Sequence, residues 1–486
     1  MSLYSPESIN AQSSAEQATA GIVIIGAGMA GSRFAIELAR AQQQSDHEHP
    51  VITLISKEPQ VGYNRIMLSP VLSGESIFED TYLYEPSEYE QLGITVLAGL
   101  SVEAIDTDQQ TIELSDGQTL AYAELVLATG SNARIIPFPN YDAKGVHVFR
   151  EIADVNALTA YARQGKRGLV IGGGVLGLEA ACALASQGAE MTVVHVDSYV
   201  LNRQLDLPAA HLLQEALICR GVALEVSAST ECITVDDQYQ VSGLLLKDGR
   251  TLPTDFIVMA VGVTPNITLA KDNGLDVNRG IVVDDLMHTS CPHVYAIGEC
   301  IELDGELFGM VAPVNQQVDT LVSVLKNIRI SSCGALTKVS TENRRPFVSK
   351  PLSLKLKVSG IAAFSAGQID FDHSESENEN VSDSKNIEKV VYQQTSLNHY
   401  LCLYIKANKL IGTVLYGEVS EGGFYSQLIT DGIDISPIKE SLIFGEAYCD
   451  VEALAAVESE SGNESELAVE SESAQISATS MMGEAS

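Results

Sequence analysis

The sequence is poor in cations. Lys and Arg together number 29 against 64 Asp and Glu, so the formal net charge is −35. Nucleic-acid binding requires clustered Lys and Arg that neutralise phosphates, and docking on an anionic lipid surface has the same requirement. We therefore expect no nucleic-acid partner and no membrane partner, whereas a small anion held locally or a basic protein partner agrees with this charge.

Long hydrophobic runs are missing as well. No stretch reaches the roughly eighteen uncharged apolar residues that a membrane-spanning helix needs. The first twenty residues are polar and acidic, without the cationic start and apolar centre of a secretory signal. We expect residues 1–20 to form a flexible leader and the protein to be cytoplasmic.

Paired cysteines are also absent. The eight cysteines lie at positions 182, 219, 232, 291, 300, 333, 402 and 449, and none belongs to a C-x-x-C pair. Zinc, iron–sulfur and dithiol sites commonly contain such pairs, so we predict none of them. The histidines show no metal-ligand spacing, and we predict no metal site. Scattered thiols agree with a reducing compartment.

A glycine motif stands where a short strand meets a helix near the N-terminus. Residues 21–25 are apolar, Gly26-Ala27-Gly28-Met29-Ala30-Gly31 follows, and residues 32–43 have a helical pattern. Such glycines let the backbone approach a pyrophosphate at the helix N-terminus, which predicts a dinucleotide site. Ser56 and Lys57 occupy the usual place of the acidic ribose ligand, so Glu58 is the candidate for that role.

A second motif repeats this arrangement. Gly172-Gly173-Gly174-Val175-Leu176-Gly177 lies between the apolar residues 168–171 and the helical stretch 178–187. Two such units in one chain predict two bound nucleotides. His195 ends the following strand, where Glu would favour NADH and Arg would favour NADPH. The absence of Arg from residues 195–202 favours NADH, and Arg203 leaves NADPH open.

Further segments complete these units. Strand-like residues 294–297 follow the second unit, so the chain is expected to return to the first sheet, with the second nucleotide domain inserted in the first. Residues 350–448 hold strand-like pieces and a helical piece near residues 423–429, which predict a mixed α+β domain. Within and after it, residues 372–388 and the chain from residue 457 on are too polar to be expected to order.

These motifs resemble the FAD- and pyridine-nucleotide-dependent reductases of the glutathione-reductase type. Leu127-Ala128-Thr129-Gly130 resembles the strand end that lies beside the flavin in that family, and Ala260–Asn266, with Gly262, resembles its return from the NAD domain. The resemblance implies that Glu179 lies near the nicotinamide. It also implies that Gly298 and Glu299 bind FAD, with Glu299 at the ribitol in place of the commoner Asp.

A closer likeness is to the flavin portion of the assimilatory NAD(P)H-dependent nitrite reductase large subunit. It rests on Gly298-Glu299-Cys300 with residues 307–313, and on Tyr63-Asn64-Arg65-Ile66-Met67-Leu68-Ser69. It implies that Arg65 and Ser69 lie near the FAD pyrophosphate and the flavin. Cys300 stands at an expected helix start, which would lower the pKa of its thiol, although the resemblance implies a packing residue.

We predict an α/β fold with two Rossmann-like dinucleotide-binding domains of the glutathione-reductase type and a C-terminal α+β domain. The FAD domain is expected at residues 21–143 and 269–335 and the NAD(P) domain at residues 144–268. The C-terminal domain is expected at residues 348–448, with a disordered loop at 372–388, followed by an acidic disordered tail at 449–486.

The predicted activity is transfer of electrons from NAD(P)H through FAD to a separate acceptor. The resemblance implies a nitrate or nitrite reductase component as this acceptor, with rubredoxin or ferredoxin as the alternative. Oxidation by oxygen is a weaker alternative, because the first cysteine is Cys182, far beyond the place where thiol-dependent relatives carry theirs. A non-catalytic redox sensor that binds FAD and NAD(P)H is an alternative of a different class. A homodimer is compatible with the sequence.

Overall fold

The computed structural model describes residues 21–44, 47–330, 336–338, 344–349, 353–358, 360–369 and 386–450. The predicted leader, residues 372–385 of the predicted loop and residues 451–486 of the predicted tail lie outside the described residues. The described residues fall into two compact units, which are considered separately. The first takes in residues up to 172, 180–192 and 230–349, and the second takes in 173–179, 193–229 and 350 onward.

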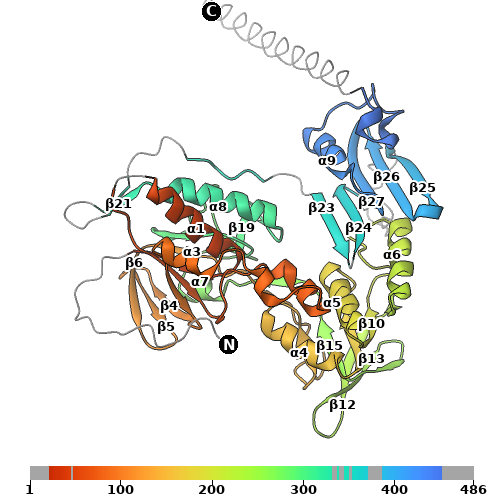
Figure 1. Ribbon diagram of the computed structural model, residues 1–486, viewed down its shortest axis with the longest axis horizontal. Coiled ribbons are helices and arrows are strands. Elements are labelled where there is room, and N and C mark those ends of the chain that lie inside the picture. The colour runs from red at the N-terminus through yellow and green to blue at the C-terminus, as the bar shows by residue number, and fades with distance from the viewer. Residues whose placement is uncertain are drawn as a thin grey trace, which may run out of the picture. The chain divides into compact units, whose positions relative to one another are not determined.

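The first unit contains a mostly parallel sheet built on strand β1. Its order is β3-β2-β1-β6-β5-β4, and β18 pairs in parallel with β6, so the chain returns to this sheet late in the sequence. Helices α1 and α8 pack together beside it, as Figure 1 shows. The strands are β1 (Gly21–Ile25), β2 (Ile52–Ser56), β3 (Thr95–Ala98), β4 (Val102–Asp106), β5 (Thr111–Leu114), β6 (Thr119–Leu127) and β18 (Val294–Ala296).

The core of this sheet follows from its sequence. Strand β1 is buried at four of its five positions, as expected of a parallel strand covered on both faces. Helix α1 (Met29–Gln43) turns Phe34 and Leu38 inward, and both side chains are fully buried. The other helices of this region are α2 (Leu68–Ser73), α3 (Pro86–Gln91), α7 (Thr268–Asp272) and α8 (Val311–Leu325).

A second sheet has the order β11-β10-β9-β15-β8, in which β15 pairs in parallel with β8 and β9. Its strands are β8 (Val146–Val148), β9 (Arg167–Ile171), β10 (Glu190–Val194), β11 (Val222–Glu225) and β15 (Phe256–Met259). The helices between them are α4 (Ile152–Ala162), α5 (Val175–Ser186) and α6 (Leu207–Cys219). An antiparallel meander follows, formed by β12 (Thr230–Val235), β13 (Val241–Leu246) and β14 (Thr251–Pro253).

Several further strands are short, and two of them lie in the segments that connect the two sheets. The two chain segments that run between the parallel sheets pair with each other, as β7 (Ser131–Ala133) and β16 (Val263–Pro265). The remaining short strands are β17 (Ile281–Val282), β19 (Ile301–Leu303), β20 (Glu306–Leu307), β21 (Ile328–Ile330) and β22 (Leu336–Lys338).

The C-terminal part is an antiparallel sheet in the order β23-β24-β27-β26-β25, with α9 (Gly422–Asp431) against β24 and β27. Its strands are β23 (Ser353–Val358), β24 (Ile361–Gly367), β25 (Glu388–Gln394), β26 (His399–Lys406) and β27 (Lys409–Tyr416). Glu388, predicted as the last loop residue, therefore begins a strand instead. Among the described residues no helix is long and apolar enough to cross a membrane.

Candidate functional site

The first glycine motif forms a turn in which each glycine meets a different constraint. Gly26 has φ +108°, and a Cβ there would lie 2.2 Å from the Ala128 carbonyl oxygen. A Cβ on Gly31 would lie 1.9 Å from the Gly26 carbonyl oxygen, whereas one on Gly28 would meet nothing within 4 Å. A bound pyrophosphate requires these three features: a tight turn at the first glycine, an open backbone at the second and close helix packing at the third. The turn therefore fits a dinucleotide.

Neighbouring segments hold this turn in place. The Ala27 carbonyl accepts hydrogen bonds from the Gly62 amide at 2.9 Å and from Ser32 Oγ at 3.1 Å. Ala30 lies beside Gly298, where a Cβ would come within 3.1 Å of the Ala30 Cβ. The structure thus brings two predicted FAD segments, Gly26–Gly31 and Gly298, side by side.

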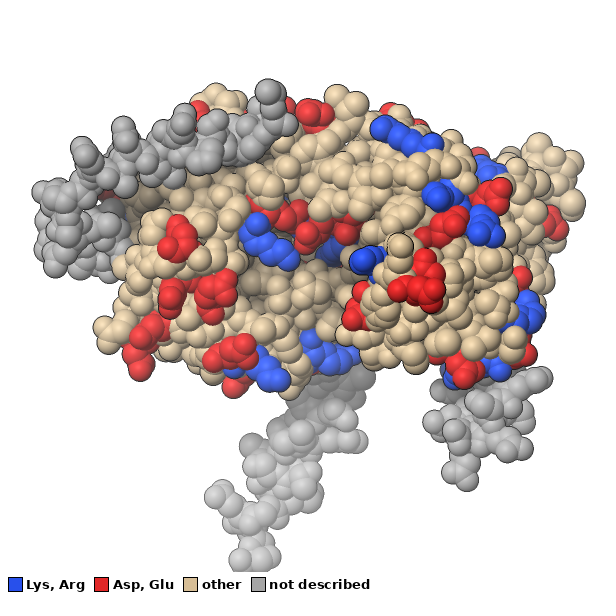
Figure 2. Space-filling view, turned by 90° about the horizontal axis from the view of Figure 1, so that it is seen from below, with Lys and Arg blue, Asp and Glu red and all other residues tan. Residues whose placement is uncertain are grey.

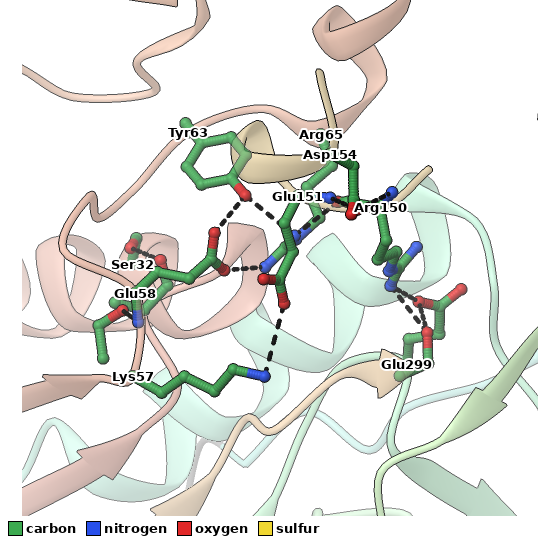
Figure 3. A network of polar contacts seen from close by, with 12 residues as sticks. Ser32, Lys57, Glu58, Tyr63, Arg65, Arg150, Glu151, Asp154 and Glu299 are labelled. Carbon is green, nitrogen blue, oxygen red and sulfur yellow. Dashed lines mark hydrogen bonds and ion pairs between the residues drawn. The ribbon is translucent and has the colours of Figure 1, made fainter. Parts of the chain in front are cut away.

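Glu58 and Arg65, predicted for the ribose and the pyrophosphate, contact each other (Figure 3). Arg65 Nη2 lies 2.5 Å from Glu58 Oε1, and the Tyr63 hydroxyl donates to Glu58 Oε2 at 2.6 Å. Burial raises the pKa of Tyr63 above its usual range, so the phenol stays a donor at neutral pH. Arg65 also donates to the Arg150 carbonyl oxygen at 2.7 Å. Glu58 is therefore held in one orientation by two donors.

Glu299, predicted for the ribitol, is held by a second arginine. Arg150 Nη2 lies 2.5 Å from Glu299 Oε2 and donates to Ser131 Oγ at 2.7 Å, and Ser131 Oγ donates to the same carboxylate oxygen at 2.5 Å. Arg150 Nε is buried and has no hydrogen-bond partner in the part of the chain that the structure describes. Figure 3 shows the Arg150–Glu299 pair next to the Arg65–Glu58 pair. The hydrogen bond from Arg65 to the Arg150 carbonyl oxygen joins the two pairs.

Sequence reasoning missed Arg150, Ser131 and Gln317. Gln317 is fully buried in α8, and its Oε1 accepts from the Gly298 amide at 2.8 Å. Ser131 directly follows Ala128-Thr129-Gly130, which was the one signal that could have identified it. Arg150 and Gln317 carry no local signal, because their partners lie far away in the sequence.

The other predicted FAD residues lie at the paired connecting strands and on α2. Thr129 Oγ1 donates to the Asn266 carbonyl oxygen at 2.7 Å, and the Asn266 amide donates to the Gly130 carbonyl oxygen at 2.8 Å. Gly262, which was predicted for the nicotinamide nucleotide, lies just before β16, and its carbonyl oxygen accepts from the Arg134 amide at 2.9 Å. Ser69 lies in α2, which packs against α4.

The second glycine motif repeats two constraints of the first, the tight turn and the open backbone. Gly172 has φ +120°, and a Cβ there would lie 2.3 Å from the Ala260 carbonyl oxygen. A Cβ on Gly174 would meet nothing within 4 Å. The rest of the motif, Val175, Leu176 and Gly177, opens helix α5, which also carries Glu179. This turn also fits a dinucleotide.

His195 packs directly on the second turn. Its Nδ1 accepts from the Gly173 amide at 3.2 Å, and a Cβ on Gly173 would lie 2.8 Å from the imidazole Cγ. Since Nδ1 accepts, the ring hydrogen belongs on Nε2, which lies 3.5 Å from Asp197 Oδ2. The His195 side chain is only 11% exposed, whereas Asp197 is 46% exposed. Asp197 therefore presents the accessible carboxylate at this strand end.

The expectation that a helix start lowers the pKa of the Cys300 thiol is wrong. It lies in a turn before β19 and is fully buried, and its Sγ contacts the Ile297 carbonyl oxygen at 3.2 Å. Burial raises the pKa of this thiol, because desolvation disfavours the thiolate. Cys182 is buried in α5. Among the described residues no three His, Cys, Asp or Glu side chains gather as a metal site would require.

Comparison with known proteins places these sites in context. The family model described as pyridine nucleotide-disulphide oxidoreductase matches residues 20–320, and that of the rubredoxin NAD+ reductase C-terminal domain matches residues 353–433. The chain is 39% identical to a nitrite reductase [NAD(P)H] of Bacillus subtilis over 85% of this chain and 48% of that protein. It is 36% identical to the assimilatory nitrate reductase electron transfer subunit of the same organism, over 87% of this chain and 51% of that protein.

A solved structure supports the architecture. The covalent putidaredoxin reductase–putidaredoxin complex matches with a TM-score of 0.74 and 24% identity, over 91% of this chain and 99% of that chain. At this identity the likeness concerns the fold, and together with the family models it confirms the predicted fold class. The chain spans about half the length of the two Bacillus subtilis relatives.

Proposed function

Because this chain belongs to the pyridine nucleotide-disulphide oxidoreductase family, and is thus an FAD-dependent NAD(P)H oxidoreductase, we propose that it passes electrons from NAD(P)H to an acceptor outside these 486 residues. The family predicted from the motifs is confirmed by the family models. The observation that carries the proposal is the pair of glycine turns: in each, a glycine with positive φ and no room for a Cβ (Gly26, Gly172) stands two residues before a glycine that is open to a ligand (Gly28, Gly174).

We assign FAD to the first turn. The open backbone at Gly28 receives the pyrophosphate, Glu58 receives the adenosine ribose, and Glu299 receives the ribitol. Each of the two carboxylates is oriented by an arginine, Arg65 for Glu58 and Arg150 for Glu299, so that its remaining acceptor capacity faces a ligand hydroxyl. When bound, FAD supplies the acceptance of hydride and the release of electrons singly or in pairs.

We assign the nicotinamide nucleotide to the second turn, with NADH preferred. Gly174 leaves the backbone open, and Asp197 lies at the strand end where the adenosine ribose is usually bound. A carboxylate there accepts hydrogen bonds from ribose hydroxyls and repels a 2′-phosphate. His195 contributes by packing on Gly173 and by accepting a hydrogen bond from its amide, and Glu179 is proposed to lie near the nicotinamide.

The proposed acceptor is a component of nitrate or nitrite reduction. The support is the likeness to the assimilatory nitrate reductase electron transfer subunit over most of this chain. Rubredoxin or ferredoxin is the second candidate, favoured by the match of the C-terminal part to a rubredoxin reductase domain. On the face shown in Figure 2, Lys and Arg are scattered among Asp and Glu, which does not offer a concentrated basic patch to an acidic carrier.

Turnover with artificial acceptors tests this proposal. The purified protein with NADH should reduce ferricyanide or a redox dye rapidly and consume oxygen much more slowly. Oxygen consumption at a comparable rate would favour an oxidase, and no turnover with any acceptor would favour a redox sensor. A cytoplasmic location and a homodimer remain predictions.

A further inference from the structure

The C-terminal sheet contacts the start of helix α6 through a buried carboxylate. Asp206 is 5% exposed and accepts hydrogen bonds from the hydroxyls of Tyr400, at 2.6 Å, and Tyr404, at 3.1 Å. Both tyrosines lie on β26, four residues apart and therefore on one face of the strand, and both are buried. Figure 1 shows α6 beside this sheet. Tyr416 of β27 adds a hydrogen bond to the Leu212 carbonyl oxygen of α6 at 3.2 Å.

Asp206 also ends the connection that leads from the second glycine turn to α6. It caps this helix, because its Oδ1 accepts from the Ala209 amide at 3.3 Å. Residues 195–206, which we name the 195–206 connection, join β10 to α6. Their far end is thus fixed by the helix cap and by two tyrosines of the C-terminal sheet.

The near end of the 195–206 connection is bonded to the glycine turn itself. The Leu201 amide donates to the Gly173 carbonyl oxygen at 2.9 Å, and the Gly173 amide donates to His195 Nδ1. Leu201 adopts φ +53°, which is unfavourable for a leucine and is maintained only by surrounding contacts. The Leu205 amide donates to the Leu201 carbonyl oxygen at 2.9 Å, and Leu205 directly precedes Asp206. A continuous set of bonds therefore runs from the turn to Tyr400 and Tyr404.

The tyrosine hydroxyls matter because Asp206 is buried. A buried carboxylate needs hydrogen-bond donors, and removing donors leaves acceptor capacity unsatisfied at a substantial cost in free energy. Burial raises the pKa of both tyrosines, so their hydroxyls remain protonated donors throughout the neutral range. Without these donors the end of the 195–206 connection would shift toward water.

We propose that Tyr400 and Tyr404 are positioning residues for the nicotinamide nucleotide, which act through Asp206 to hold the 195–206 connection against the second glycine turn. The inference rests on the proposed nucleotide site at that turn. It gives the C-terminal sheet a part in binding NAD(P)H, because the Leu201 and His195 contacts that shape the turn depend on where the connection ends.

The double variant Tyr400→Phe/Tyr404→Phe in the FAD-loaded protein tests this inference. It keeps both rings in the core and removes both donors. The dissociation constant for NAD⁺ in calorimetry and the KM for NADH should rise together by about fivefold, as expected for coupling through a packed network. The FAD content and kcat should stay unchanged.

Tyr425→Phe is the matched control. Tyr425 is also a fully buried tyrosine of the C-terminal part, but its hydroxyl donates to the Leu442 carbonyl oxygen at 2.9 Å, away from α6. This control should lower the melting temperature without changing the affinity for NAD⁺. If the double variant cannot be folded, Tyr400→Phe alone provides the same comparison with a smaller expected rise.

Two results would overturn the inference. Only the second would also overturn the proposed nucleotide site. Unchanged NAD⁺ affinity in a folded double variant would mean that the tyrosines serve stability alone, with the proposed function intact. A wild-type protein that does not bind NAD⁺ would overturn the proposed nucleotide site and this inference with it.

Discussion

At the scale of residues, each carboxylate assigned to FAD is oriented by an arginine. The Arg65–Glu58 pair has side chains 24% and 14% exposed, and the Arg150–Glu299 pair 21% and 22%, so both are partly shielded from water. Removing one member of such a pair leaves the other without its strongest partner. In the proposed FAD site, the arginines preserve the geometry with which the carboxylates would meet ligand hydroxyls.

Arg150→Gln is expected to weaken FAD binding about tenfold, because charged hydrogen bonds of this kind contribute on the order of 1.5–3 kcal/mol. Reconstitution of apoprotein with FAD, followed by fluorescence, measures the change. Arg33→Gln is the control, since Arg33 pairs with the well-exposed Asp319 at 3.2 Å. Equal loss of FAD affinity in both variants would contradict a specific role for Arg150.

Cys300 should be a slow thiol. Its pKa is raised, so the reactive thiolate is scarce at neutral pH, and its side chain is fully buried. Cys219 is exposed and should react with a thiol reagent before Cys300 does. Mass spectrometry after brief labelling checks the order, and modification of Cys300 before global unfolding would show that the buried environment opens.

The glycine turns were predictable from sequence, whereas the residues that orient the carboxylates were not. Gly26 and Gly172 need positive φ, a requirement that leaves a local signature. Arg150 contacts Glu299, which is 149 residues away in the sequence. Gln317 accepts a hydrogen bond from Gly298 and lies in α8, a helix that was not predicted from the sequence. Such pairings depend on the tertiary fold, for which spacing offers no signal.

At the scale of elements, each glycine turn and the helix after it form one binding unit. Helix α1 begins at Met29 and α5 at Val175, each three residues before the predicted start, because the motif itself supplies the first helical turn. The predicted starts were late since glycine is a poor helix former, while the observed starts are set by packing on the strand. In the proposed sites, the helix N-terminus and the open glycine thus face the same ligand.

The two units should respond differently to one substitution. Gly28→Val should give protein without FAD, and Gly174→Val should keep FAD but lose its reduction by NAD(P)H, because each new side chain fills the open space at its own turn. Absorbance spectra before and after anaerobic addition of NADH separate the two. Identical behaviour of both variants would refute the assignment of one nucleotide to each turn.

At the scale of the whole molecule, the proposed function places two nucleotide sites in a chain whose sequence has no closely spaced cysteine pair. In that proposal, electrons received from NAD(P)H pass to a group beyond these residues. The B. subtilis relatives are about twice as long as the span they share with this chain, which agrees with a shared electron-input portion. The C-terminal part is similar to the rubredoxin NAD+ reductase C-terminal domain over residues 353–433.

An anaerobic titration tests the central claim most directly. NADH is added to the purified protein while the flavin absorbance is followed, and an oxidised nitrate or nitrite reductase component, a rubredoxin or a ferredoxin is then added in turn. The account predicts that NADH bleaches the flavin and that one of these proteins restores its colour without oxygen. A flavin that NADH and NADPH leave oxidised, or one that stays reduced with every protein acceptor, would contradict it.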